Sequence, residues 1–151
     1  MSTSTMAPVI RVERVETDTQ FNHVFDIRTS VFVNESSIDQ EDEYDGFDFL
    51  SNHYLAYYDN VPAGTARWRM VPGSGKVRLE RFAVSKEYRS KGIGKALMDA
   101  LLEEIPKNKE IFIHVQTHNV PYYERFGFVT EGETFEEAGI EHQKLVYQPQ
   151  P

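Results

Sequence analysis

Apolar residues have the spacing of helices in some segments of the chain and the spacing of strands in others. Between residues 21 and 34, apolar side chains recur every three or four positions, which predicts a helix with Thr17 or Asp18 as its N-cap. A longer helix is predicted over 91–105, where Pro106 ends it, and a short one over 121–126. β-Branched and aromatic runs predict strands over 9–12, 54–58, 63–70, 77–84, 111–115, 128 onward and 142–147.

This order of elements predicts an α/β domain with a mixed, largely antiparallel sheet. The turns at 59–60 and 72–75 join three consecutive strands as hairpins, and the segment 35–48 is expected to be mostly loop. With 151 residues the chain has the size of one domain, so we expect a single domain over 1–151. Residues 1–6 and 148–151 are expected to be flexible tails.

The composition excludes several classes of site. The chain has no cysteine, which removes disulfides, zinc thiolates and a covalent cysteine intermediate. No apolar stretch is long enough to span a bilayer and the N-terminus does not resemble a signal peptide, so we expect a cytoplasmic protein without a membrane partner. A net charge of -8 argues against a nucleic-acid partner, and the acidic residues lack the spacing of a calcium loop, so no metal is expected.

The charge is unevenly distributed along the sequence. Residues 67–95 contain nine basic and two acidic side chains, whereas 35–48 contain seven acidic and no basic ones. The basic block suggests an anionic ligand, and the acidic block suggests a cationic one, whose capture would weaken with salt. The alternative for both blocks is an ordinary solvated surface.

A glycine motif lies between a predicted strand and the longest predicted helix. It reads Arg89-Ser-Lys-Gly92-Ile-Gly94, and glycines at a helix N-terminus allow backbone N–H groups to approach a phosphate. The dinucleotide fingerprint is excluded because Leu97 occupies its third glycine position. A Walker A loop around Gly75-Lys76 is excluded because Met70 replaces its first glycine.

Two blocks of the sequence resemble one family. The run from Leu79-Glu-Arg-Phe-Ala-Val84 into the glycine motif is similar to the acetyl-CoA-binding motif of the GNAT superfamily of N-acetyltransferases. Some 30 residues later, Pro121-Tyr-Tyr-Glu-Arg-Phe-Gly-Phe128 resembles that superfamily's second hallmark. Further matches, such as Phe135-x-Glu-x-Gly-Ile-x-His142, extend the resemblance to the small ElaA/YjcF-like branch, over nearly the whole chain.

The resemblance implies the GNAT fold, a sheet of six to seven strands flanked by helices and splayed between its two central strands. It also implies acetyl-CoA as the cosubstrate, with its pyrophosphate on the glycine motif and its pantetheine arm along the strand that ends at Val84. The cofactor-binding residues expected on this basis are Phe82, Ala83, Val84, Arg89, Ser90, Lys91, Gly92, Ile93, Gly94, Lys95, Gln116 and Asn119.

Two residues are candidates for proton transfer. Tyr123 lies where the superfamily has the general acid that protonates the CoA thiolate; the alternative is a core aromatic residue. Glu80 is the candidate general base; the alternative is a buried ion pair with a neighbouring arginine. Strict alternation along the strand would place Glu80, Phe82 and Val84 on one face.

The acceptor side is less defined by the sequence. Arg28, Arg67, His53 and His142 are the substrate-binding candidates, and a structural role is the alternative for each histidine. We expect an N-acetyltransferase that transfers an acetyl group to a primary amine of a small molecule or a protein. With no cysteine available, direct attack in a ternary complex is expected. The alternative is a non-catalytic acyl-CoA-binding sensor or interaction module, and either a monomer or a homodimer fits the sequence.

Overall fold

The computed structural model describes residues 7–38 and 43–149. These residues form a seven-stranded sheet with the order β1-β2-β3-β4-β5-β7-β6. The β4–β5 pair is parallel and the other neighbouring pairs are antiparallel, which confirms the predicted fold class. The strands are β1 (Ile10–Arg14), β2 (Asn52–Tyr58), β3 (Val61–Met70), β4 (Val77–Val84), β5 (Ile111–Gln116), β6 (Phe128–Glu137) and β7 (Ile140–Tyr147).

The helices begin close to the predicted residues. The Thr17 side chain accepts a hydrogen bond from the N–H of Gln20 and completes a capping box, so Thr17 is the N-cap of the first helix. The predicted helix over 21–34 falls on two elements, because α1 ends at Arg28 and a π-helix follows over Thr29–Glu35. The helices are α1 (Asp18–Arg28), η1 (Thr29–Glu35), η2 (Asp48–Leu50), η3 (Lys86–Tyr88), α3 (Ile93–Glu104), η4 (Thr117–Asn119) and α4 (Val120–Glu124).

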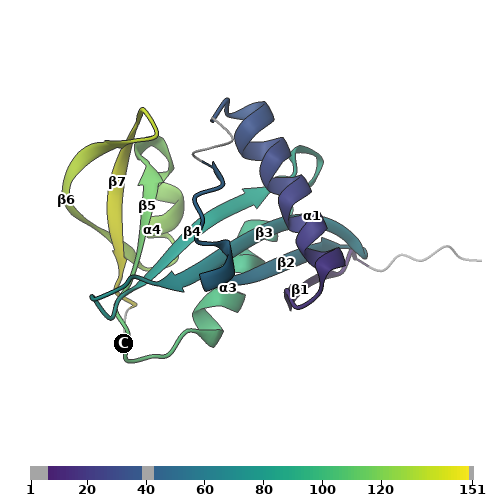
Figure 1. Cartoon of the computed structure of the whole chain (residues 1–151), viewed down its shortest axis with the longest axis horizontal. Coiled ribbons are helices and arrows are strands. Elements are labelled where there is room, and N and C mark those ends of the chain that lie inside the picture. The colour runs from purple at the N-terminus through teal and green to yellow at the C-terminus, as the bar shows by residue number, and fades with distance from the viewer. Residues whose placement is uncertain (1–6, 39–42, 150–151) are drawn as a thin grey trace, which may run out of the picture.

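Helices cover the sheet on both faces (Figure 1). On one face α3 buries Ile93, Leu97, Met98 and Leu101 against residues such as Leu79, and this is the larger core. On the other face α1 packs its apolar side over β2 and β4 in a smaller core. The spacing of the four α3 residues is that of a helix with one buried face, as the sequence pattern predicts.

The two central strands β4 and β5 separate along their length. Their pairing covers three positions, from Val77 opposite Ile111 to Leu79 opposite Ile113. Beyond Leu79 the two strands diverge, which confirms the predicted splay. The β5-facing edge of β4 therefore has no β5 partner in its second half, where Phe82, Ala83 and Val84 lie.

A β-bulge in β4 interrupts the alternation of side chains that the sequence predicted for this strand. Arg81 has a φ of 58°, and the register with β3 shifts between Thr65 and Arg67. The extra residue reverses the faces beyond it, so that Phe82 joins the α3-side core with Leu79, while Ala83 joins the α1-side core. Glu80 and Phe82 therefore do not share a face as strict alternation predicted.

The predicted N-terminal tail, 1–6, lies outside the described residues, as do the last two residues of the predicted C-terminal tail. Of the remaining two, Gln148 donates a backbone hydrogen bond to the carbonyl oxygen of Gly127 at 2.8 Å. None of the helices in the described part of the chain has the length and hydropathy needed to cross a membrane.

Candidate functional site

The glycine motif forms an open turn at the start of α3. Ser90 and Gly92 both have left-handed backbone conformations, with φ of 64° and 89°, and Gly92 is the N-cap of the helix. No side chain caps this helix, so its first backbone N–H groups keep their hydrogen-bonding capacity for a ligand. Backbone N–H groups at a helix N-terminus suit an anion such as a pyrophosphate.

A pocket of about 910 Å³, called here the loop pocket, lies beside this turn. It contains ten of the twelve residues predicted to bind the cofactor; Lys91 and Gln116 are outside its lining, and the side chain of Lys91 lies over the ring of Tyr58 instead. The lining residues are Val31, Phe82, Ala83, Val84, Tyr88, Arg89, Ser90, Gly92, Ile93, Gly94, Lys95, Asn119, Tyr122, Tyr123, Arg125 and Phe126.

Arg89 holds the glycine turn against two other parts of the chain. Its Nε donates to the carbonyl oxygen of Val84 at 3.0 Å, which ties the turn to the end of β4. Its two terminal nitrogens donate to both carboxylate oxygens of Glu35, at 2.9 and 2.8 Å, which ties the turn to the end of the π-helix. The Arg89 side chain therefore positions the turn, and the backbone N–H groups of the turn are left as the candidate element for an anion.

A second pocket, called here the splay pocket, opens where β4 and β5 separate and has a volume of about 560 Å³. Its lining mixes apolar side chains with charged groups from the loop at 43–47, β3 to β7, η1 and η4. The residues are Val31, Phe32, Ser36, Ile38, Glu43, Asp45, Phe47, Arg69, Arg78, Leu79, Glu80, Arg81, Phe82, Ile113, His114, Val115, Gln116, His118, Asn119, Tyr123, Glu137, Ala138, Ile140 and His142.

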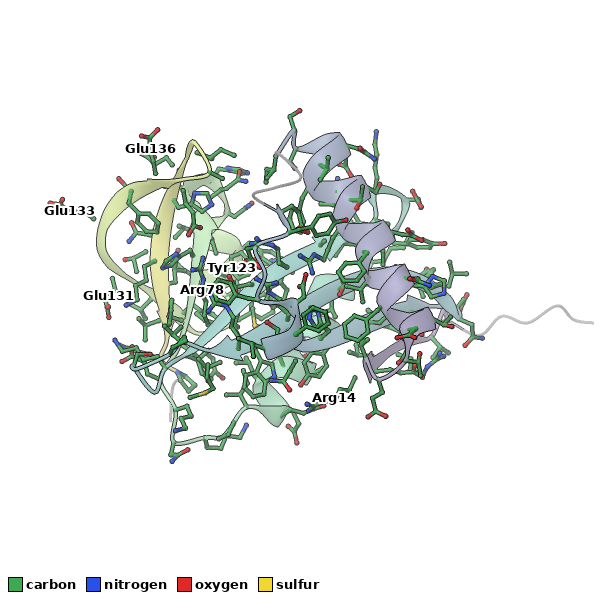
Figure 2. The ribbon with its side chains drawn as sticks, in the orientation of Figure 1. Arg14, Arg78, Tyr123, Glu131, Glu133 and Glu136 are labelled. Carbon is green, nitrogen blue, oxygen red and sulfur yellow. The ribbon has the colours of Figure 1, made fainter. Side chains whose placement is uncertain are left out.

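Tyr123 borders both pockets. It lies on α4, packs edge-on against Phe82 and Phe128, and is seen with Arg78 where the two halves of the sheet separate (Figure 2). Within the described part of the chain its hydroxyl makes no hydrogen bond to protein. Burial raises the pKa of Tyr123, so the phenol keeps its proton at neutral pH. The group is a proton donor placed between the two cavities.

Glu80 is held by three arginines. One carboxylate oxygen accepts hydrogen bonds from Arg67 at 3.1 Å and Arg69 at 2.5 Å, and the other lies 3.3 Å from Nε of Arg78. Burial raises the pKa of Glu80, but the hydrogen bond from Arg69 and the charges of Arg67 and Arg78 outweigh it, and the pKa lies below its usual value. A carboxylate so stabilised in its charged form is a weak base, which favours the ion-pair alternative.

Three predicted substrate-binding residues lie behind the wall of the splay pocket. Arg28, Arg67 and His53 are each at most 2% exposed, and none of them lines either pocket. Arg28 binds the buried carboxylate of Glu43, Arg67 binds Asp48 and Glu80, and His53 Nε2 lies 3.0 Å from the carbonyl oxygen of Asp48. The prediction that they contact the substrate is therefore corrected to a supporting role; His142, by contrast, lines the splay pocket.

The acidic segment 35–48, expected either to attract a cationic ligand or to be solvated, uses most of its described carboxylates in ion pairs with arginines. Glu43, Asp45 and Asp48 point inward onto arginines, and Glu35 pairs with Arg89; Asp39, Glu41 and Asp42 lie outside the described residues. In and behind the walls of the splay pocket, five carboxylates form ion pairs with five arginines. The carboxylates are those of Glu43, Asp45, Asp48, Glu80 and Glu137, and the arginines are Arg28, Arg67, Arg69, Arg78 and Arg81. The basic block is likewise largely neutralised, so neither block defines the charge of the ligand.

Sequence reasoning missed His114 and His118, which line the splay pocket. It also missed Tyr122 and Arg125, which line the loop pocket. His114 alternates with Phe112 and Gln116 along a predicted strand, so strand periodicity could have placed it beside Gln116. Glu137, which also lines the splay pocket, is the glutamate of the motif that ends at His142, but the sequence analysis gave it no role of its own. Among residues 7–38 and 43–149, no cluster of acidic and histidine side chains has the arrangement needed to hold a metal ion.

Comparisons with known proteins agree with these features. The family model described as "Acetyltransferase (GNAT) domain" matches residues 26–148. A Bacillus subtilis protein named as an acetyltransferase is 40% identical over 92% of this chain and 97% of its own length. The uncharacterized N-acetyltransferase YjcF of the same organism is 35% identical, over 84% of this chain and 91% of its own length. The crystal structure of an acyl-CoA N-acyltransferase from Pseudomonas aeruginosa superposes with a TM-score of 0.80 at 26% identity, covering 94% of this chain and all of that one. The chain therefore belongs to the GNAT family of N-acetyltransferases, in the branch of YjcF and ElaA that its motifs resemble.

Proposed function

We propose that the enzyme transfers the acetyl group of acetyl-CoA to a primary amine by direct attack within a ternary complex. The observation that carries this proposal is the position of Tyr123 between the loop pocket and the splay pocket. A donor that binds in the first pocket and an acceptor that binds in the second would bring their reacting atoms together beside this hydroxyl. The absence of cysteine supports direct attack, because no thiol is available to carry an acetyl group.

The loop pocket fits the two parts of acetyl-CoA. The uncapped start of α3 and the left-handed turn at Ser90 and Gly92 offer backbone N–H groups to the pyrophosphate. The second half of β4, where the splay removes the β5 partner, offers backbone N–H and C=O groups to the amides of the pantetheine arm. Asn119 and Phe82 border both pockets and would flank the thioester end.

The protein contributes a proton donor and a shaped acceptor site. The Tyr123 hydroxyl would protonate the departing thiolate as the carbon–sulfur bond breaks. The balanced charges around the splay pocket favour neither a strongly cationic nor a strongly anionic acceptor. Apolar side chains on its walls, including Phe32, Phe47 and Ile140, would contact the carbon skeleton of the amine.

The proposal is tested by measuring CoA release over a panel of amines, amino sugars, polyamines and lysine peptides. Because the chain has no cysteine, a thiol reagent detects only the CoA that is released. We expect release that depends on the amine, with a matching mass increase of one acetyl group on the acceptor. Binding of acetyl-CoA without turnover on any amine would support the non-catalytic binding module instead.

The glycine turn gives a second prediction. Gly92→Val is expected to abolish the rise in melting temperature that acetyl-CoA causes, because a side chain at φ 89° would deform the turn that presents the N–H groups. Gly75→Val is the matched control, since Gly75 has a similar φ of 70° in a hairpin turn that lines neither pocket. Thermal shift with and without acetyl-CoA compares the two; an undiminished rise in Gly92→Val would contradict the assignment of the turn.

A further inference from the structure

The tip of the β6–β7 hairpin brings a carboxylate onto two histidines. Ala138 and Gly139 form the turn with φ of 53° and 75°, and Glu137 lies opposite Ile140 just before it. From this position the Glu137 side chain reaches His114 on β5 and His142 on β7. All three side chains line the splay pocket, whereas the other acidic residues labelled on β6 point outward (Figure 2).

Glu137 is fixed as a carboxylate. One of its oxygens lies 3.2 Å from Nδ1 of His114 and 3.0 Å from a terminal nitrogen of Arg78, and both of these nitrogens donate. The hydrogen bond from His114 and the charge of Arg78 lower the pKa of Glu137 to about 2. The group is therefore a permanent negative charge in the pocket at neutral pH, and its second oxygen faces His142.

The hydrogen bond of His142 determines which of its ring nitrogens is free. Its Nδ1 lies 2.7 Å from the carbonyl oxygen of Ile140, and since a carbonyl can only accept, Nδ1 carries the hydrogen. In the neutral ring the lone pair is then on Nε2. That nitrogen lies 3.8 Å from the second oxygen of Glu137, beyond hydrogen-bonding distance, and makes no hydrogen bond to the described residues. The imidazole ring of His142 is also stacked on the ring of Phe135.

We propose that Nε2 of His142 is the base that accepts a proton from the acceptor amine, and that Glu137 is the positioning residue that stabilises the resulting imidazolium. The inference rests on the proposed acetyl transfer. The ammonium loses one proton to Nε2, and the free amine then attacks the carbonyl carbon, forming the C–N bond. As the C–S bond breaks, Tyr123 protonates the thiolate, and the second amine proton returns to the tyrosinate through water. Deprotonation of His142 by solvent releases the one net proton of the reaction.

Of the other basic groups at the pocket, Glu80 and His114 are less suited to this role, and His118 lies exposed on η4. Glu80 is committed to three arginines, and His114 is held by Glu137 and lies between the rings of Phe112 and Phe135. His142 lies opposite Gln116, at the end of β5 that leads through η4 to the helix carrying Tyr123.

Charged and titratable groups from several elements share the pocket of His142. They are Glu137 on β6, His114 on β5, His118 on η4, Tyr123 on α4, Arg69 on β3, Arg78, Glu80 and Arg81 on β4, and Glu43 and Asp45 in the loop before β2. Of these, Glu137 is the one with a contact to the ring. The carboxylate of Glu137 is therefore the group placed to stabilise an imidazolium that forms during the reaction.

The decisive experiment is the pH dependence of kcat/KM for His142→Gln, with an amine found in the CoA-release screen. Imidazoles as a class titrate between about pH 5 and 8, so the wild type should lose activity on the acid side of that range. We expect the variant to be about 10²–10³-fold slower and to lack this acid limb, with acetyl-CoA binding unchanged. His23→Gln on α1, outside both pockets, is the control. An acid limb retained in His142→Gln overturns the proposal.

Glu137→Gln separates positioning from a merely structural role. Without the carboxylate the imidazolium that forms in the reaction has no counter-charge beside it, so kcat should fall by about tenfold while the KM of the amine changes little. A loss of stability alone would lower the amount of folded protein and leave kcat per active site unchanged. An unchanged kcat per active site in this variant contradicts the role of Glu137.

A measurement that needs no turnover keeps this inference separate from the proposed function. NMR of ¹⁵N-labelled histidines in the CoA-bound protein reports the tautomer of His142. We expect hydrogen on Nδ1 in the neutral ring, because Nδ1 faces the carbonyl oxygen of Ile140. Hydrogen on Nε2 overturns the inference even if the enzyme acetylates amines; the expected spectra without any amine turnover would instead refute the proposed function.

Discussion

Replacing Tyr123 by phenylalanine is expected to lower kcat by about 10²–10⁴-fold, which is the usual contribution of general acid–base catalysis. The substitution keeps the ring that packs against Phe82 and Phe128 and removes only a hydroxyl that makes no hydrogen bond to the described residues. The melting temperature and the affinity for acetyl-CoA should therefore change little. Steady-state kinetics on the best amine of the screen, together with a thermal shift, measures both quantities.

Tyr122→Phe is the matched control for this experiment. Tyr122 is the preceding residue on α4 and lines the loop pocket alone, so its hydroxyl is not at the junction of the two cavities. Because Tyr122 borders the proposed acetyl-CoA site, loss of its hydroxyl can change the KM of acetyl-CoA, but kcat should stay within a few-fold of the wild type. Pre-steady-state kinetics must first show that the chemical step limits the rate. If both variants are then as active as the wild type, Tyr123 is a packing residue and not the general acid.

The sequence predicted the fold because its local signals agree with one another. The spacing of Ile93, Leu97 and Leu101 describes a helix with one buried face, and the capping box at Thr17 marks the start of α1. The glycine turn was predictable for the same reason, because the left-handed backbone at Gly92 is a local requirement that glycine meets. Nine of the twelve predicted cofactor residues line the loop pocket because they belong to one strand end and the turn that follows it, and Asn119 joins them from η4.

The acceptor side could not be predicted in the same way, because its side chains come from distant elements. The bulge at Arg81 reverses the faces of β4, and nothing in the local residue pattern marks the extra residue. The carboxylates of the loop before β2 were expected to face a cationic ligand or solvent. In the structure Asp45 pairs with Arg67 and Asp48 pairs with Arg28. Charge per segment does not show which partner each charge will find in three dimensions.

Glu80→Gln is expected to lower the free energy of unfolding by about 3–5 kcal/mol, because it removes the one carboxylate that lies between three arginines. Arg69 and Arg78 are directly opposite each other on β3 and β4; Arg78 would keep its ion pair with Glu137, but Arg69 would lose the carboxylate of Glu80. The melting temperature should fall by roughly 10 °C. Glu131→Gln is the control. Glu131 lies on the edge strand β6, is half exposed, and pairs with Lys144 of β7.

The pH dependence of stability and of activity then decides between the two roles of Glu80. Its pKa is lower in the folded chain than the ordinary value of 4.5, so its contribution to stability is complete above about pH 4.5 and is lost as the pH falls through the folded value. Glu80→Gln should therefore destabilise the protein at pH 7 and bring it closer to the wild type at low pH. In an ion-pair role the acid limb of kcat/KM stays where it was, because the proton acceptor is unchanged. A variant with wild-type stability that has lost this limb would instead identify Glu80 as the general base.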